Sequence, residues 1–134
     1  MINSKQNFVT IAEFLELAMQ FEADSAEFYT AMKQMVSPED STTQELLNLL
    51  IREENEHRNT LRRYEGGAAS ASLLQFPPSF SFSMPGLPEE APGLDACIEI
   101  GLLRERKSVE IYTNAATMTT GDFQRLLQGL AAFE

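Results

Sequence analysis

The amino-acid sequence predicts an all-α fold: a four-helix bundle made of two helical hairpins that one long crossover joins. Four segments carry apolar residues at spacings of three and four, which is the period of one helical face. Two short connections and one long connection separate these segments. An internal repeat also relates the second pair of segments to the first. The chain has 134 residues, and we predict that residues 1–134 form a single domain.

Residues 8–36 are predicted to form the first helix. Thr10 is a candidate N-cap, and Glu13 lies three residues later, where it can complete a capping box. Pro38 ends the segment, because proline disfavours helical backbone in the residue before it. The residues expected on the buried face recur at spacings of three, four or seven: Ile11, Leu15, Ala18, Ser25, Tyr29, Met32 and Val36.

Residues 41–65 are predicted to form the second helix, which stops at the candidate C-cap Gly66-Gly67. Its buried stripe includes Leu47, Leu50, Leu61 and Tyr64. Residues 66–93 hold five of the six prolines and show no helical period, so we predict the crossover there. An extended chain covers roughly 3.3 Å per residue, which lets this segment run the length of a bundle. It is too apolar for a free linker, and we expect it to cover the bundle or a second copy of the chain.

The second hairpin is predicted from residues 94–118 and 122–134. The third helix has its stripe on Ile98, Leu102, Val109 and Tyr112. The fourth helix, expected to be short or truncated, has its stripe on Phe123, Leu127 and Leu130. A four-helix bundle with one long crossover is the ferritin-like arrangement.

The repeat is visible in two pairs of segments. "EADSAEFYTAMKQM" (22–35) and "ERKSVEIYTNAATM" (105–118) share Glu, Ser, Glu, Tyr, Thr and Met at a constant offset of 83. "LLNLLIREE" (46–54) and "LLQGLAAFE" (126–134) align at an offset of 80. Chance similarity between amphipathic helices accounts for the leucines more readily than for a Glu and a Tyr seven residues apart in both halves.

Several carboxylates occupy core positions of these stripes. Glu54 and His57, the single histidine, follow the rhythm of the second helix, whereas Glu53 and Glu56 lie off it. The same pattern turns Glu22 inward in the first helix and Glu105 inward in the third. In the fourth helix, Glu134 matches Glu54. The four carboxylates are therefore expected to converge near the centre of the bundle.

Burying four like charges costs several kcal/mol per ion unless cations compensate them. The nearby arginines fall off the stripes: Arg52, Arg58, Arg62 and Arg104. We therefore expect divalent cations between the carboxylates. Oxygen ligands together with an imidazole suit iron, manganese or zinc better than magnesium or calcium.

The composition excludes several other classes of protein. A formal net charge of -10 disfavours nucleic acid and anionic membrane surfaces as partners, because both require positive patches. The single cysteine, Cys97, rules out intrachain disulfides and Cys-x-x-Cys metal or redox pairs. The sequence has no continuous apolar run of the kind that a signal peptide or a membrane span requires. A cytoplasmic location is the expectation.

On "EADSAEFY", "EENEH" and "ERKSVEIY", the chain resembles the rubrerythrin branch of the ferritin-like di-iron carboxylate proteins. The resemblance implies a site with two iron ions, for which manganese or zinc could substitute. It makes Glu22 and Glu105 terminal ligands, Glu54 and Glu134 bridging ligands, and His57 a nitrogen ligand. Tyr29 and Tyr112 would then donate hydrogen bonds to these ligands.

The resemblance also implies a di-iron or dimanganese protein of redox or iron-handling role, a ferroxidase or peroxidase type that oxidises ferrous iron or reduces peroxide. With one cysteine there is no rubredoxin-like domain, so an external electron donor is expected, and we expect a homodimer. The family pattern has a histidine three residues after Glu134. Either the natural chain continues past Glu134, as we expect, or the second metal position lacks its nitrogen. The alternative function is a non-catalytic helical-bundle interaction protein with a structural or vestigial metal site.

Overall fold

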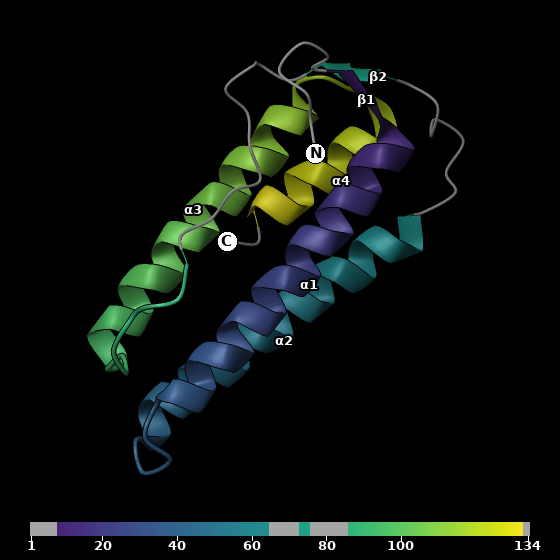
Figure 1. The fold of residues 1–134 in the computed structure, drawn as a ribbon. Coiled ribbons are helices and arrows are strands. Elements are labelled where there is room, and N and C mark those ends of the chain that lie inside the picture. The colour runs from purple at the N-terminus through teal and green to yellow at the C-terminus, as the bar shows by residue number, and fades with distance from the viewer. Residues whose placement is uncertain (1–7, 65–72, 76–85, 133–134) are drawn as a thin grey trace.

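In the computed structural model, four helices form two antiparallel hairpins (Figure 1). The structure describes residues 8–64, 73–75 and 86–132. Within this part the predicted all-α bundle is confirmed, with one short pair of strands in addition. The first hairpin consists of α1 (Ile11–Met35) and α2 (Ser41–Tyr64), and the second of α3 (Leu94–Ala116) and α4 (Gly121–Ala132).

The two strands join the start of the chain to the crossover. Strand β1 (Phe8–Thr10) pairs antiparallel with β2 (Leu73–Gln75), and Val9 lies opposite Leu74. Both Val9 and Leu74 are buried. The pairing explains why α1 begins three residues later than predicted. Most of the crossover, at 65–72 and 76–85, lies outside the described residues.

The predicted start of α1 has the expected capping box. Thr10 Oγ1 accepts a hydrogen bond from the Glu13 amide at 3.0 Å, and Glu13 Oε1 accepts one from the Thr10 amide at 2.8 Å. All seven residues predicted for the inner face of this segment are buried: Ile11, Leu15, Ala18, Ser25, Tyr29, Met32 and Val36. In α2, the predicted core residues Leu47 and Leu61 are likewise fully buried.

The predicted stripe of α3 is wrong in its first half. Ile98 and Leu102 are 40% and 50% exposed, whereas Cys97 and Arg104 are buried. Two series of positions in α3, one residue apart, both have helical spacing. The structure buries the series that contains Cys97, Arg104 and Ser108 and leaves Ile98 and Leu102 of the other series exposed.

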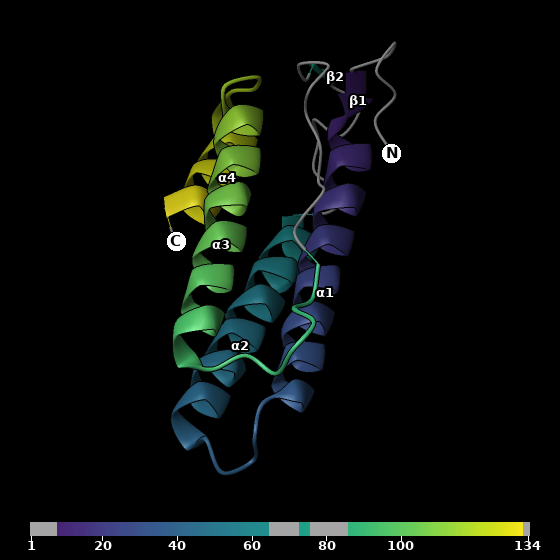
Figure 2. The same cartoon turned by 60° about the vertical axis from the view of Figure 1, so that its left-hand side comes forward.

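The buried residues form two apolar clusters with a polar layer between them. The cluster nearer the strands includes Phe14, Leu61, Ile111, Phe123 and Leu127. The other, nearer the α1–α2 turn, comprises Tyr29, Met32, Val36, Leu47 and Cys97. On each of α1, α2 and α3, the residues that lie between the two clusters include buried polar side chains. Figure 2, turned by 60°, shows the two hairpins that enclose this layer.

Among the described residues, every helix is too short or too polar to cross a bilayer.

A matched pair of glycine substitutions tests the start of α4. Gly121 has φ +74°, a left-handed conformation in which a Cβ costs roughly 1–2 kcal/mol, so Gly121→Ala should lower the free energy of unfolding by that amount. Gly129, exposed inside the same helix with open space around it, should give the opposite effect. Gly129→Ala is expected to add about 1 kcal/mol. Urea denaturation measures both, and equal stability of the two variants would contradict the assignment.

Candidate metal centre

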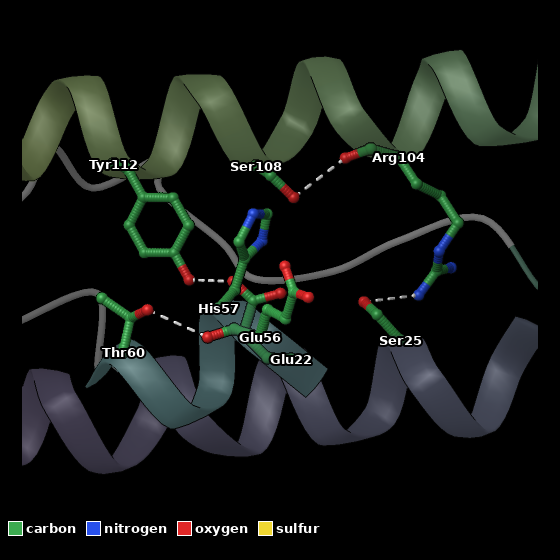
Figure 3. Close-up of polar contacts among 8 residues, drawn as sticks. All are labelled: Glu22, Ser25, Glu56, His57, Thr60, Arg104, Ser108 and Tyr112. Atoms are coloured by element: carbon green, nitrogen blue, oxygen red, sulfur yellow. Dashed lines mark hydrogen bonds and ion pairs between the residues drawn. The ribbon is translucent and has the colours of Figure 1, made fainter. Parts of the chain in front are cut away.

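The polar layer is built from residues that helical spacing places on facing surfaces of three helices. Glu54 and His57 lie three residues apart, which puts them on one face of α2. Glu22 of α1 lies beside His57, and Tyr112 of α3 points its hydroxyl toward Glu22 (Figure 3). The buried polar residues of the layer, none more than 5% exposed, are Glu22, Ser25, Glu54, His57, Arg104 and Ser108.

Three of the predicted ligands come together. Glu22, Glu54 and His57 each offer one ligand atom, and these atoms lie within 4.8 Å of one another. His57 Nδ1 is 3.5 Å from Glu22 Oε2. Glu54 Oε1 is buried, and no hydrogen-bond donor of the described residues reaches it. Two carboxylates and an imidazole that converge in a buried layer form a donor set that fits a divalent transition metal.

Tyr112 holds one of these carboxylates in place. Its hydroxyl donates a hydrogen bond to Glu22 Oε2 (Figure 3). Burial, followed by the negative charge of Glu22, raises the pKa of Tyr112 well above its ordinary value. The phenol therefore stays protonated and remains a donor, which fixes the orientation of Glu22 toward α2.

The layer keeps a proton when it holds no metal. Burial raises the pKa of Glu54 to about 10, and a hydrogen bond to Glu22 and the charge of Glu22 act in the same direction. The charges of His57 and Arg104 act against this rise. Glu54 is therefore a neutral acid at pH 7 that shares its proton with Glu22. A metal ion bound between them would displace this proton, because carboxylates coordinate in their ionised form.

The structure does not assign the other predicted site residues to this group. Among the described residues, Glu105 is not one of those whose ligand atoms gather with His57, and its side chain is half-buried on α3. Glu134 lies outside the described residues. Tyr29 is fully buried further along α1, with its ring centroid 5.7 Å from Arg104 Cζ. The roles of all three therefore stay predictions.

Arg104 was predicted to lie off the buried stripe, and that prediction is wrong. Its side chain is 5% exposed, its Cζ lies 3.8 Å from the ring centroid of Phe28, and its Nη2 donates to Ser25 Oγ at 3.1 Å. The helical stripe missed it because the inward series of α3 begins one residue earlier. The repeat carried a usable signal, since an offset of 83 pairs Arg104 with the core residue Phe21.

Comparison with known proteins gives one family. The family model described as rubrerythrin matches residues 13–134. No curated protein and no solved structure matches the chain. The matched range includes all four helices except the first two residues of α1.

The protonation of Glu54 predicts how the metal-free protein responds to pH. Its pKa is about 10 in the folded chain and near 4.5 when unfolded, so unfolding between these values releases a proton. The free energy of unfolding should therefore fall as pH rises from 6 to 8, by at most about 1.4 kcal/mol per pH unit. Urea denaturation of the metal-free protein at several pH values measures the slope.

The matched variants for this measurement are Glu54→Gln and Glu56→Gln. Glutamine at position 54 carries no titratable proton, so the pH dependence should become shallower. Glu56 is exposed two residues further along α2, and its replacement should leave the slope unchanged. Identical slopes in all three proteins would mean that Glu54 is ionised in the metal-free layer.

Proposed function

Because the chain belongs to the rubrerythrin family, we propose that it is an iron-handling redox protein that oxidises ferrous iron or reduces peroxide. The observation that carries the proposal is the buried convergence of Glu22, Glu54 and His57. Carboxylate and imidazole ligands suit iron and manganese, and zinc fits the same donors without redox chemistry. Iron is proposed first, with manganese as its substitute.

The protein's own groups support this role in three ways. Tyr112 keeps Glu22 oriented through a hydrogen bond. Glu54 carries a proton that metal binding can release, which makes affinity rise with pH. The two apolar clusters on either side limit the access of water to the layer. A bound iron ion would supply a one-electron redox couple for reaction with oxygen or peroxide.

The partners follow from the same reasoning. Electrons for peroxide reduction are proposed to come from an external donor, because a rubredoxin-type iron site uses four cysteines and these 134 residues contain one. We also propose a homodimer. Its support is the exposed apolar surface on α3, formed by Ile98, Leu102 and Leu103, which are 40–52% exposed.

The second candidate function is a non-catalytic bundle whose metal site is structural or vestigial. It is favoured by the proton that Glu54 shares with Glu22, since this hydrogen bond satisfies part of the layer without a metal. A protein that binds iron and leaves it ferrous in air would fit this candidate.

Anaerobic addition of ferrous iron tests the proposal. Metal-free protein should bind iron and, on exposure to air, oxidise it faster than buffer does. His57→Ala and Glu54→Ala should each lower the affinity at least tenfold, because each removes one of three converging ligands. Glu56→Ala, which changes an exposed glutamate of the same helix, should bind like the wild type. Failure of the wild-type protein to take up ferrous iron would refute the proposal.

Removing the hydroxyl that orients Glu22 gives a separate prediction. Tyr112→Phe keeps the buried ring and loses the hydrogen bond, so ferrous iron affinity should fall about 10–100-fold. Equilibrium dialysis measures the affinity, and circular dichroism checks that the helices are intact. Unchanged affinity would show that Glu22 needs no support from α3.

A further inference from the structure

We propose that the layer binds one metal ion, because the guanidinium of Arg104 supplies a buried positive charge within the layer where a second ion would otherwise add its own. The inference rests on the proposed function, because it assumes that Glu22, Glu54 and His57 hold a metal. A centre with one metal ion, and not two, is inferred because Arg104 is a buried cation in the same layer.

The position of Arg104 follows from the geometry of the first hairpin. Glu22 of α1 faces His57 of α2, with Oε2 and Nδ1 3.5 Å apart. The helices α1 and α2 run antiparallel, so one helical turn further along the bundle axis the residue after Glu22 on α1 is Ser25 and the residue before His57 on α2 is Glu54. Ser25 and Glu54 therefore lie at the same height in the bundle. Arg104 Nη2 donates to Ser25 Oγ at 3.1 Å (Figure 3). From the helical spacing, we infer that its guanidinium lies at the level of Glu54.

Arg104 is built into this position. Its Cζ lies 3.8 Å from the ring centroid of Phe28, and the side chain is 5% exposed. A stacked guanidinium with a hydrogen-bonded nitrogen has few alternative positions. Burial lowers the pKa of Arg104, yet arginine keeps its proton in proteins. The internal repeat has the apolar Phe21 at the corresponding place in α1, so the cation is particular to the second half of the chain.

The charges of the layer then favour a single divalent ion. Glu22 and Glu54 bring two negative charges when ionised, and Arg104 brings one positive charge. One divalent ion already takes these groups past neutrality. A second ion would add two positive charges beside a guanidinium, in surroundings where water screens poorly. In support, the charge of Arg104 counts among the influences that lower the pKa of Glu54.

Among the described residues, no further carboxylate joins the three converging ligands. Glu105, the predicted terminal ligand of a second ion, belongs to the same helix as Arg104 and follows it directly. Within the part of the chain that the structure describes, its carboxylate does not join the group of Glu22, Glu54 and His57. Among the described residues, α3 therefore contributes the cation Arg104 to the layer, while the carboxylate of Glu105 lies outside the group of three converging ligands.

Titration of metal-free protein with Mn(II) under argon tests the inference, with calorimetry for stoichiometry and electron paramagnetic resonance for the environment of the ion. The wild type should bind one Mn(II) per chain and show the hyperfine pattern of an isolated ion. Arg104→Lys, which keeps a cation, should behave the same way. Arg104→Met, which removes the charge and keeps an unbranched side chain, should bind a second Mn(II) at least tenfold more tightly than the wild type does.

Each other outcome has a distinct meaning. Two equivalents bound to the wild type, with the spectrum of an exchange-coupled pair, would overturn the inference and leave the proposed function standing. A second equivalent that is no tighter in Arg104→Met would also overturn it. Absence of Mn(II) and ferrous iron binding by the wild type would overturn both. If Arg104→Met does not fold, the wild-type stoichiometry and spectrum decide alone.

Discussion

The fold depends on a constraint that is rare in a small helical bundle: a layer of buried ionisable groups lies between two apolar clusters. The clusters supply the burial that holds the hairpins together, and the layer between them has to be neutralised within its own volume. From α3, the Tyr112 phenol donates a hydrogen bond to Glu22, and the Arg104 guanidinium donates one to Ser25. The packing of the second hairpin against the first therefore includes these polar contacts within the layer.

The structure indicates two ways of meeting that constraint. Without metal, Glu54 holds a proton and shares it with Glu22, while Tyr112 donates to the other partner and Arg104 adds a positive charge. A bound divalent ion would replace this proton, with Glu22 and Glu54 as ionised ligands and Tyr112 still donating to Glu22.

Sequence alone was sufficient for the first hairpin and insufficient for the second. In α1 and α2 one series of positions is mostly apolar and buried, so Glu22, Glu54 and His57 stood out as polar residues at core positions. In α3 the apolar series at Ile98 is exposed and a polar series containing Arg104 is buried. Local periodicity cannot rank two such series, because the choice depends on contacts with the other helices and not on spacing within one helix. The β1–β2 pair was missed for a related reason, since it joins residues far apart in the sequence.

The most direct test of the account uses the single histidine. Since His57 is the only one in the chain, a two-bond proton–nitrogen NMR spectrum reports on one imidazole without assignment. Zn(II) serves as a diamagnetic probe of the same donor set. The account predicts that one equivalent of Zn(II) converts the imidazole signals, in slow exchange, to those of a ring with one metal-bound nitrogen. Imidazole signals unchanged by excess Zn(II) would contradict a metal centre at Glu22, Glu54 and His57.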